Sequence, residues 1–321
     1  MCMKKILITG ALGQIGTELT EYLREQYGND NVIASNRSKH GDDSFFEAGP
    51  FELLNVLDAK GLAEVCRKYG INQIIHLAAI LSANAEKNPQ TAYDINMNGT
   101  YNVLEVAREL GIAVFTPSSI AAFGANTPAD NTPQDTIQRP STMYGVTKVA
   151  GELLCDYYFK KYGVDTRGVR FPGIISYAAL PGGGTTDYAV HIYYEALKNK
   201  KYASYIGAGT YMDMMYMPDA LKAVHDLMEA NPDKLLHRNA FNVTAMSFEP
   251  EMLAAEIRKH IPEFILTYDV DPVRQAIADS WPNSLDDSAA RAEWGWNPEY
   301  DLASMTKDML EKLAIKLNIK E

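Results

Sequence analysis

Thr9-Gly10-Ala11-Leu12-Gly13-Gln14-Ile15-Gly16 follows the first apolar run of the chain and precedes a helical pattern. Glycines let the backbone turn tightly and let a pyrophosphate approach, while the first N–H groups and the dipole of the following helix attract its charge. The spacing is Gly-x-x-Gly-x-x-Gly rather than the usual Gly-x-Gly-x-x-Gly. Such a turn can be purely structural, but its place at the start of an alternating pattern favours dinucleotide binding.

Short apolar runs alternate with helical patterns through the first half of the chain. The runs that read as strands are residues 5–9, 31–35, 72–77, 112–116 and 166–171. Each helical pattern ends at a glycine, which supplies the left-handed residue that closes many helices. These glycines are Gly28, Gly70, Gly111 and Gly163. Because strands that alternate with helices form helix-covered parallel sheets, the sequence predicts an α/β protein with a doubly wound, Rossmann-type sheet.

The second half mixes helical patterns with short apolar runs, such as residues 241–244 and 264–268. We expect residues 1–170 to form an NAD-binding Rossmann domain. Residues 171–321 are expected to form mainly a smaller α/β substrate-binding lobe, with segments such as 213–245 returning to the first domain. The methionine-rich run 212–217 is expected to pack in a core, because thioether side chains fill irregular gaps.

The composition of the 321-residue chain limits its partners and its compartment. The formal net charge of −11 disfavours nucleic acid and anionic membranes, and no apolar run approaches the ~18 residues of a membrane span. The chain enters its first strand at once, without the pattern of a signal peptide. Three scattered cysteines and dispersed histidines fit a reduced, cytoplasmic protein without a bound metal.

Tyr144 and Lys148 stand four positions apart, a spacing that places both on one face of a helix. Alone, such a pair is more often a half-buried tyrosine beside a solvated lysine. The glycine turn, together with Ser119 after the fifth expected strand, favours a catalytic interpretation. A phenol titrates near ~10, but a nearby ammonium and an oxidised nicotinamide ring favour the phenolate. Tyr144 would then take a proton from an alcohol while hydride leaves the same carbon.

These three features together make the chain resemble the extended short-chain dehydrogenase/reductase family, from Lys4 to the C-terminal helix. The glycine turn of that family matches Gly10, Gly13 and Gly16, and its helix asparagine corresponds best to Asn96. The resemblance implies a homodimer formed by the helices that carry Asn96 and Tyr144. It also implies a catalytic set, which consists of Tyr144, Lys148, Ser119 and Asn96.

The end of the second expected strand bears on the cofactor. An acidic residue is usual there, to hold the adenosine ribose, but this chain has Asn36 followed by Arg37. Asn36 carries no charge that would repel the 2′-phosphate of NADP. Arg37 and Lys39 are either solvated loop cations or residues that attract this phosphate. We expect NAD, with NADP as the alternative. The expected cofactor-binding residues are Gly10, Gly13, Gln14, Ile15, Gly16, Asn36, Arg37, Asn55, Val56, Leu77, Ala78, Ala79, Tyr144, Lys148 and Pro172.

A loop rich in glycine and threonine spans residues 180–188, and loops of this kind often serve a ligand. With residues 81–89, 117–124 and 279–287, it makes the chain most similar to the zinc-independent L-threonine 3-dehydrogenases of the family. That resemblance implies NAD-dependent oxidation of the C3 hydroxyl of L-threonine to 2-amino-3-oxobutyrate, in threonine catabolism. Asn36 and Asn55 depart from the aspartates expected in these enzymes. The expected substrate-binding residues are Ser82, Ser119, Tyr144, Gly184, Thr185, Thr186, Asp187 and Trp281.

Two alternatives remain at this point. A nucleotide-sugar epimerase, dehydratase or reductase has the same fold, but it usually grips a diphosphate with arginine. No arginine occurs between Arg170 and Arg238, where much of the substrate lobe is expected. An NAD(P)-sensing protein without catalysis would need the glycine turn, but not Ser119, Tyr144 and Lys148 together.

Overall fold

Six parallel strands form the central sheet of the computed structural model, which describes residues 4–178 and 182–319. Their order is β3-β2-β1-β4-β5-β7, and Ile6 pairs with Val32 on one side and with Gln73 on the other. The predicted doubly wound parallel sheet is confirmed. The strands are β1 (Ile6–Thr9), β2 (Val32–Asn36), β3 (Phe51–Leu53), β4 (Gln73–His76), β5 (Ala113–Phe115) and β7 (Thr166–Arg167).

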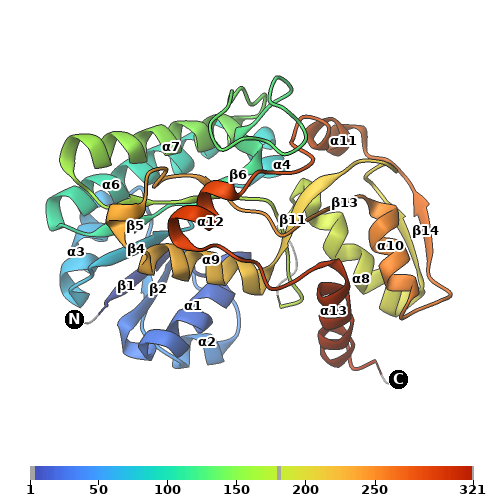
Figure 1. Ribbon diagram of the computed structural model, residues 1–321. Helices are drawn as coiled ribbons and strands as arrows, with labels where there is room; N and C mark the ends of the chain where they lie inside the picture. Colours follow the sequence, from blue (N-terminus) through green and yellow to red (C-terminus); the bar gives the residue numbers. More distant parts are fainter. Residues whose placement is uncertain (1–3, 179–181, 320–321) are drawn as a thin grey trace.

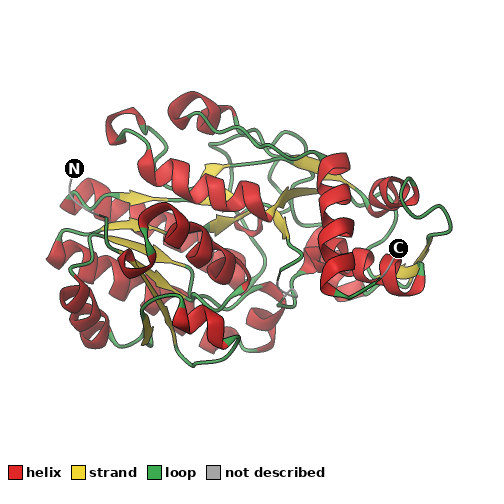
Figure 2. Cartoon of the chain, turned by 90° about the horizontal axis from the view of Figure 1, so that it is seen from below, coloured by secondary structure: helices red, strands yellow, loops and turns green. Residues whose placement is uncertain are grey.

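Helices cover both faces of this sheet, as Figures 1 and 2 show. One face packs on α3 (Ala59–Tyr69), α6 (Gly99–Leu110) and α7 (Met143–Tyr162). The other packs on α1 (Gln14–Tyr27), α9 (Met217–Glu229) and α12 (Ser288–Trp294). The central strands are therefore fully buried, which explains why they consist of near-continuous apolar runs.

The remaining elements are short or belong to the C-terminal half. The other helices are η1 (Asn29–Asn31), α2 (Asp43–Glu47), α4 (Ser82–Lys87), α5 (Pro89–Tyr93), η2 (Asp94–Asn98), η3 (Ile120–Ala122), η4 (Thr185–Asp187), α8 (Tyr188–Asn199), η5 (Pro232–Lys234), α10 (Pro250–Arg258), α11 (Pro272–Ala278) and α13 (Leu302–Lys316). The other strands are β6 (Ser118–Ser119), β8 (Val169–Phe171), β9 (Gly173–Ile175), β10 (Lys201–Ser204), β11 (Met212–Tyr216), β12 (Phe241–Asn242), β13 (Met246–Phe248) and β14 (Ile265–Tyr268).

The run 166–171, predicted as one strand, is divided at Gly168 between two sheets. β7 closes the central sheet, whereas β8 lies between β12 and β6 in a separate three-stranded sheet. The N–H of Gly168 donates to the carbonyl of Arg238, and its carbonyl accepts from Phe241. A Cβ at this position would stand 2.4 Å from the carbonyl oxygen of Thr116. Only a residue without a side chain allows this exchange of partners.

The C-terminal half has its own apolar core, to which α8, α10 and α13 contribute. The methionine-rich run is buried in β11 and at the start of α9, as predicted. We propose residues 1–170 and 171–321 as the two functional domains. Packing of α9 against α1 supports the return of segment 213–245 to the first domain.

Glycines end the helices as expected. Gly28, Gly70, Gly111 and Gly163 follow α1, α3, α6 and α7 with φ between +62° and +89°. The carboxylate of Asp58 caps α3 by accepting from the N–H of Gly61. No helix in residues 4–178 and 182–319 is long and apolar enough to cross a membrane.

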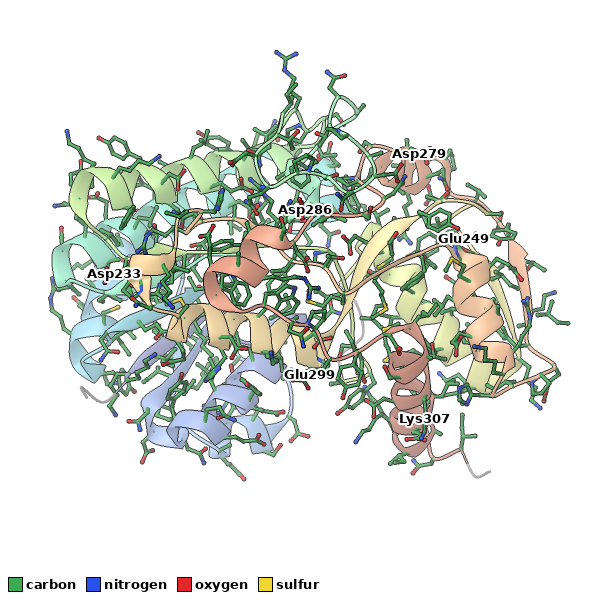
Figure 3. All side chains as sticks on the ribbon, viewed as in Figure 1. Asp233, Glu249, Asp279, Asp286, Glu299 and Lys307 are labelled. Atoms are coloured by element: carbon green, nitrogen blue, oxygen red, sulfur yellow. The ribbon has the colours of Figure 1, made fainter. Side chains whose placement is uncertain are left out.

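Acidic side chains lie around the outside of the molecule, among them Asp233, Asp279 and Glu299 (Figure 3). Their excess over basic side chains produces the net charge of −11.

Candidate active site

A cavity of about 1070 Å³, measured with the solvent at its mouth, opens at the carboxyl ends of β1, β4, β6 and β8. Ligands bind to α/β sheets at this edge. Its lining includes most of the predicted site: Gly10, Gly13, Gln14, Ile15, Gly16, Leu77, Ala79, Ser82, Ser119, Tyr144, Lys148, Pro172, Gly184, Thr185, Thr186, Asp187 and Trp281. Residues far apart in the sequence therefore meet in one cavity.

The glycine turn is packed so closely that Gly10 and Gly16 have no room for side chains. Gly10 has φ +73°, and a Cβ there would stand 2.7 Å from the nitrogen of Ala78. A Cβ at Gly16 would stand 2.3 Å from the carbonyl oxygen of Gly10. The turn therefore brings β1, β4 and the start of α1 together, and it leaves bare backbone beside the cavity.

The start of α1 fits a pyrophosphate. Gly13 provides no side-chain cap, so the first N–H groups of α1 can serve an anion. The side-chain amide nitrogen (Nε2) of Gln14 is buried and has no hydrogen-bond partner among the described residues, and Gln14 lines the cavity. An orphaned donor beside a helix N-terminus is the chemistry that a bound dinucleotide would satisfy.

The residues expected at the adenosine end lie outside the cavity lining, at the ends of β2 and β3. Asn36 pairs with Leu53 in the sheet, and its side-chain amide donates to the carbonyl of Ser38 at 3.0 Å. Arg37 is exposed, and the Asn55 side chain accepts from the N–H of Leu57. Val56 is buried and lies against Gly99. Their role in cofactor binding stays a prediction.

Tyr144 and Lys148 lie together in the first turns of α7, which Thr142 caps by accepting from the N–H of Gly145. The Lys148 ammonium lies 5.4 Å from the centre of the Tyr144 ring and donates to the carbonyl of Pro117 at 2.6 Å. Burial raises the pKa of Tyr144 to about 12, and a hydrogen bond with Ser119 lowers it. Burial also lowers the pKa of Lys148 to about 8. These shifted groups converge on one point of the cavity, as in active sites.

Asn96 lines a neighbouring cavity of about 470 Å³, which Lys148 also lines. It belongs to a π-helical turn, a distortion often found at functional sites. Its amide group exchanges two hydrogen bonds with the backbone of Ile80, and it donates to the Thr147 hydroxyl at 3.1 Å. Asn96 thus joins the segment after β4 to α7. Its catalytic role stays a prediction.

His76, at the end of β4, is placed near Lys148 but is not available as an acid or base. Its ring nitrogens lie 2.8 Å and 3.2 Å from the hydroxyls of Thr9 and Thr100. Burial and the Lys148 charge lower the pKa of His76 to about 3. The neutral ring holds β1, β4 and α6 together.

The loop 180–188 contributes one wall of the cavity through Gly184, Thr185, Thr186 and Asp187. Its residues Leu180 and Pro181 lie outside the described residues. The carboxylate of Asp187 accepts from the N–H groups of Gly183 and Gly184 at 2.9 and 2.6 Å, which fixes the loop. The Thr185 side chain is fully buried, and its hydroxyl has no partner among the described residues. Burial raises the pKa of Asp187, while the two N–H groups lower it.

Several lining residues were not predicted: Leu81, Pro117, Ser118, Ile120, Phe171, Gly173 and Ile174. Most are apolar residues beside a predicted polar one, or at the end of β8. The rule that ligands bind at the carboxyl ends of parallel strands could have found Phe171, the last residue of β8. Ala78, although predicted, lines only the smaller cavity.

The cavity, the glycine turn and the Ser119–Tyr144–Lys148 group define an enzyme that uses a nicotinamide cofactor, of the oxidoreductase or epimerase class. Residues 6–244 match the model of the NAD-dependent epimerase/dehydratase family, and the chain belongs to that family. An uncharacterized epimerase/dehydratase from Staphylococcus haemolyticus (strain JCSC1435) is 59% identical over 314 residues, which cover 98% of this chain and 99% of that protein.

Two solved structures confirm the predicted resemblance. The L-threonine dehydrogenase from Clostridium difficile is 66% identical, with a TM-score of 0.96 and 98% of each chain covered. A monomeric L-threonine 3-dehydrogenase from a metagenome is 46% identical, with a TM-score of 0.92, and the match covers 98% of this chain and 99% of that chain.

Proposed function

We propose that this protein is an NAD-dependent L-threonine 3-dehydrogenase, which oxidises the C3 hydroxyl of L-threonine to give 2-amino-3-oxobutyrate. The observation that carries the proposal is the meeting of Ser119, Tyr144 and Lys148 with the loop 182–187 in one cavity. The similarity to L-threonine dehydrogenase structures at up to 66% identity supports the same substrate.

The residues of the chain have distinct roles in this proposal. The turn at Gly10–Gly16 and the carboxyl ends of β4 and β8 would hold NAD, which accepts the hydride from C3 when bound. Tyr144 takes the proton of the C3 hydroxyl, and the Ser119 hydroxyl orients that oxygen and stabilises its developing charge. Lys148 provides the positive charge that favours the Tyr144 phenolate.

A nucleotide-sugar substrate is the less favoured alternative. Among the lining residues that the structure describes, Lys148 is the cationic side chain, and there is no arginine. Arg170 is committed elsewhere, since its guanidinium is buried against Glu152. A diphosphate would therefore lack the bidentate donors that usually bind it, whereas a small amino acid matches the hydroxyls and the carboxylate of loop 182–187.

Absorbance of reduced nicotinamide tests this proposal directly. Purified protein with NAD should show an increase at 340 nm on addition of L-threonine, and none on addition of UDP-sugars. A chelator should leave the rate unchanged, because no metal takes part in the proposed reaction. If L-threonine produces no reduced cofactor while a nucleotide sugar is converted, the epimerase alternative holds instead.

We predict that NAD is preferred over NADP by a modest factor. Asn36 leaves its side-chain oxygen for a ribose hydroxyl but carries no charge against a 2′-phosphate. Asn36→Asp should raise the ratio of kcat/KM for NAD over NADP by about tenfold or more, because a carboxylate repels the phosphate. Steady-state kinetics with both cofactors give this ratio. A clear preference of the unaltered enzyme for NADP would instead assign Arg37 to the phosphate.

We predict that loop 182–187 holds the amino-acid part of the substrate. Asp187→Asn keeps an oxygen for the N–H groups of Gly183 and Gly184 but removes the charge that would attract an ammonium. The expected loss in kcat/KM for L-threonine is about tenfold or more, with little change in NAD binding. Asp301→Asn is the matched control, since the Asp301 carboxylate also accepts from a backbone N–H, that of Ser304, but lies at the start of α13. If Asp187→Asn and Thr186→Ala both keep the original kcat/KM, the loop does not bind the substrate.

We propose a homodimer that buries the outer face of α6 and α7. Exposed apolar side chains lie along it, with Tyr101 at 49%, Leu153 at 62% and Tyr157 at 50% exposure. Leu153→Glu should convert the dimer to a monomer, because the dimer would have to bury the charge of the new carboxylate in its interface. Light scattering after gel filtration measures the mass. Leu236→Glu, 83% exposed on another surface, is the control. A monomeric unaltered protein, as in the metagenome relative, would contradict the proposal.

We also propose that the protein works in the cytoplasm. The described cysteines, Cys66 and Cys155, are buried free thiols, which suits a reducing compartment. Cys2 lies outside the described residues.

A further inference from the structure

Glu152 is a buried acid on α7 that the proposed chemistry leaves unused. Tyr144, Lys148 and Glu152 follow one another at intervals of four residues and therefore share one face of the helix. Lys148 and Glu152 line the same cavity of about 470 Å³, together with Ser118. The Glu152 side chain is only 9% exposed. A carboxylate this deeply buried requires a charged partner and hydrogen bonds.

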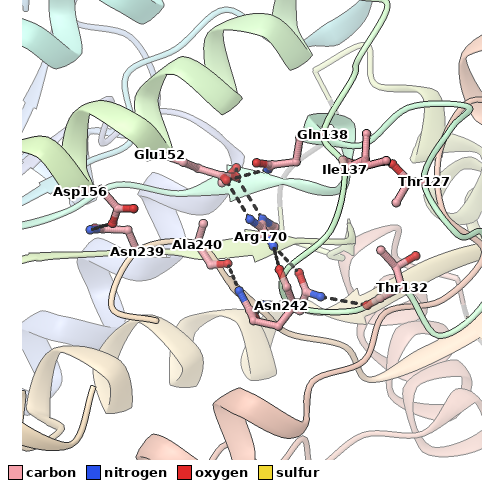
Figure 4. Close-up of polar contacts among 12 residues, drawn as sticks. Thr127, Thr132, Ile137, Gln138, Glu152, Asp156, Arg170, Asn239, Ala240 and Asn242 are labelled. Atoms are coloured by element: carbon pink, nitrogen blue, oxygen red, sulfur yellow. Dashed lines mark hydrogen bonds and ion pairs between the residues drawn. The ribbon is translucent and has the colours of Figure 1, made fainter. Parts of the chain in front are cut away.

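Arg170, on β8, is that partner (Figure 4). Its Nε and Nη2 atoms donate to the two carboxylate oxygens of Glu152 at 3.1 and 2.9 Å. The carboxylate also accepts from the Gln138 amide at 2.7 Å and from the Ser118 hydroxyl. The Nη1 atom of Arg170 donates to the Asn242 side chain at 3.0 Å and to a backbone carbonyl. Both ions are therefore bound in a fixed geometry.

These contacts tie the catalytic helix to the strand that carries Ser119. Ser118 pairs with Arg170 and Ser119 with Phe171 in the ladder between β6 and β8. Lys148 donates to the carbonyl of Pro117, one residue before β6. The helix is thus attached to this strand at two successive turns, through Lys148 and through Glu152.

Charged and titratable groups of three elements face Lys148. On α7 they are the Tyr144 phenol, the Cys155 thiol and the Glu152 carboxylate; on β4 there is the neutral His76 ring, and on β8 the Arg170 guanidinium, which contacts Glu152. Burial lowers the pKa of Lys148, whereas the Glu152 charge raises it. Glu152 thus supplies a negative charge that opposes the effect of burial on the Lys148 ammonium.

We propose that Glu152 is a positioning residue: bound to Arg170 and Ser118, it keeps the Lys148 ammonium charged and aligned with Tyr144 and Ser119. This inference rests on the proposed dehydrogenase chemistry of Tyr144 and Lys148, but not on which alcohol is oxidised.

The test compares Glu152→Gln, Arg170→Met and the double variant. Glu152→Gln keeps the shape of the side chain but removes its charge, so Lys148 loses its proton more readily. The alkaline limb of the pH profile of kcat/KM should move to lower pH by about one pH unit. Arg170→Met keeps the carboxylate and should not move the limb in that direction. Each single variant leaves the other member of the buried ion pair without its partner, and should therefore lower Tm by roughly 5–10 °C.

The double variant separates stability from positioning. Because it removes both charges, it should recover much of the lost Tm, yet its alkaline limb should stay displaced as in Glu152→Gln. An unmoved limb in Glu152→Gln would overturn the proposal. An equal displacement in Arg170→Met would also overturn it, since both would then report a loosened fold.

NADH fluorescence titrations against pH provide a readout that needs no substrate. If Lys148 helps to hold the cofactor, Glu152→Gln should weaken NADH binding at pH 8–9 by about tenfold relative to the unaltered protein, and much less at pH 6. A pH-independent change would contradict the inference. Lack of threonine oxidation by the unaltered enzyme would refute the proposed function alone, because this titration still tests Glu152.

Discussion

Replacement of Tyr144 by phenylalanine is expected to lower kcat for L-threonine by about 100-fold or more, while NAD binding stays largely intact. The phenyl ring fills the same site, which leaves Tyr144 only 9% exposed. What is lost is the hydroxyl, the proposed base. Without a bound cofactor, burial raises the pKa of Tyr144 to about 12. The Lys148 ammonium, 5.4 Å from the ring centre, and the Ser119 hydroxyl must therefore favour the phenolate during the reaction.

Tyr158→Phe is the matched control for this variant. Tyr158 is also buried, lies on the same helix and donates its hydroxyl proton to Glu105 on α6. Its loss should leave kcat unchanged and lower only stability, by about 1 kcal/mol. Stopped-flow measurement of the first turnover separates the chemical step from product release. Near-normal turnover of Tyr144→Phe would show that another group is the base.

The central sheet could be predicted because local signals agree with the fold. Strands buried on both faces are continuous apolar runs, and the helices between them end at glycines with positive φ, such as Gly70 and Gly111. The glycine turn is equally local, since it joins one strand to the next helix. The fold class and the position of the glycine turn could therefore be predicted from the sequence.

The parts that escaped prediction depend on contacts between distant segments. Gly168 separates β7 from β8 because its neighbours are Thr116, Arg238 and Phe241. The ion pair between Glu152 and Arg170 joins a helix to a strand of another sheet, and only its four-residue spacing from Lys148 hints at it. Periodicity within one segment carries no information about such partners.

The contacts within the loop 180–188 also could not be predicted from the sequence. The composition of residues 180–188 indicated a ligand-binding loop, but it did not indicate that the Asp187 carboxylate accepts from the N–H groups of Gly183 and Gly184 in its own loop. That contact gives Asp187 a structural role beside the proposed one. The test with Asp187→Asn is needed for this reason.

Gly10→Ala should weaken NADH binding by about 100-fold and should also lower the thermal stability. At φ +73° an alanine is strained by roughly 1–2 kcal/mol. Its Cβ would in addition stand 2.7–2.9 Å from the nitrogen and Cα of Ala78 and the carbonyl carbon of Leu77. These are backbone atoms of the segment after β4, so no rotamer change can relieve the clash. The turn must move away from β4, and the cradle for the pyrophosphate moves with it.

Gly209→Ala is the control that separates the steric clash from the backbone strain in Gly10→Ala. Gly209 has φ +75°, but a Cβ there meets no atom within 4 Å, and the residue does not line the cavity. This control therefore carries the same backbone strain without the clash, and it should lose a little stability while NADH binding stays unchanged. Fluorescence titration with NADH and thermal unfolding of both variants give the two quantities. Equal NADH affinity in Gly10→Ala and Gly209→Ala would mean that the contact between the turn and β4 does not shape the cofactor site. In that case the N–H groups of α1 alone, rather than the packed turn, would determine where the pyrophosphate binds.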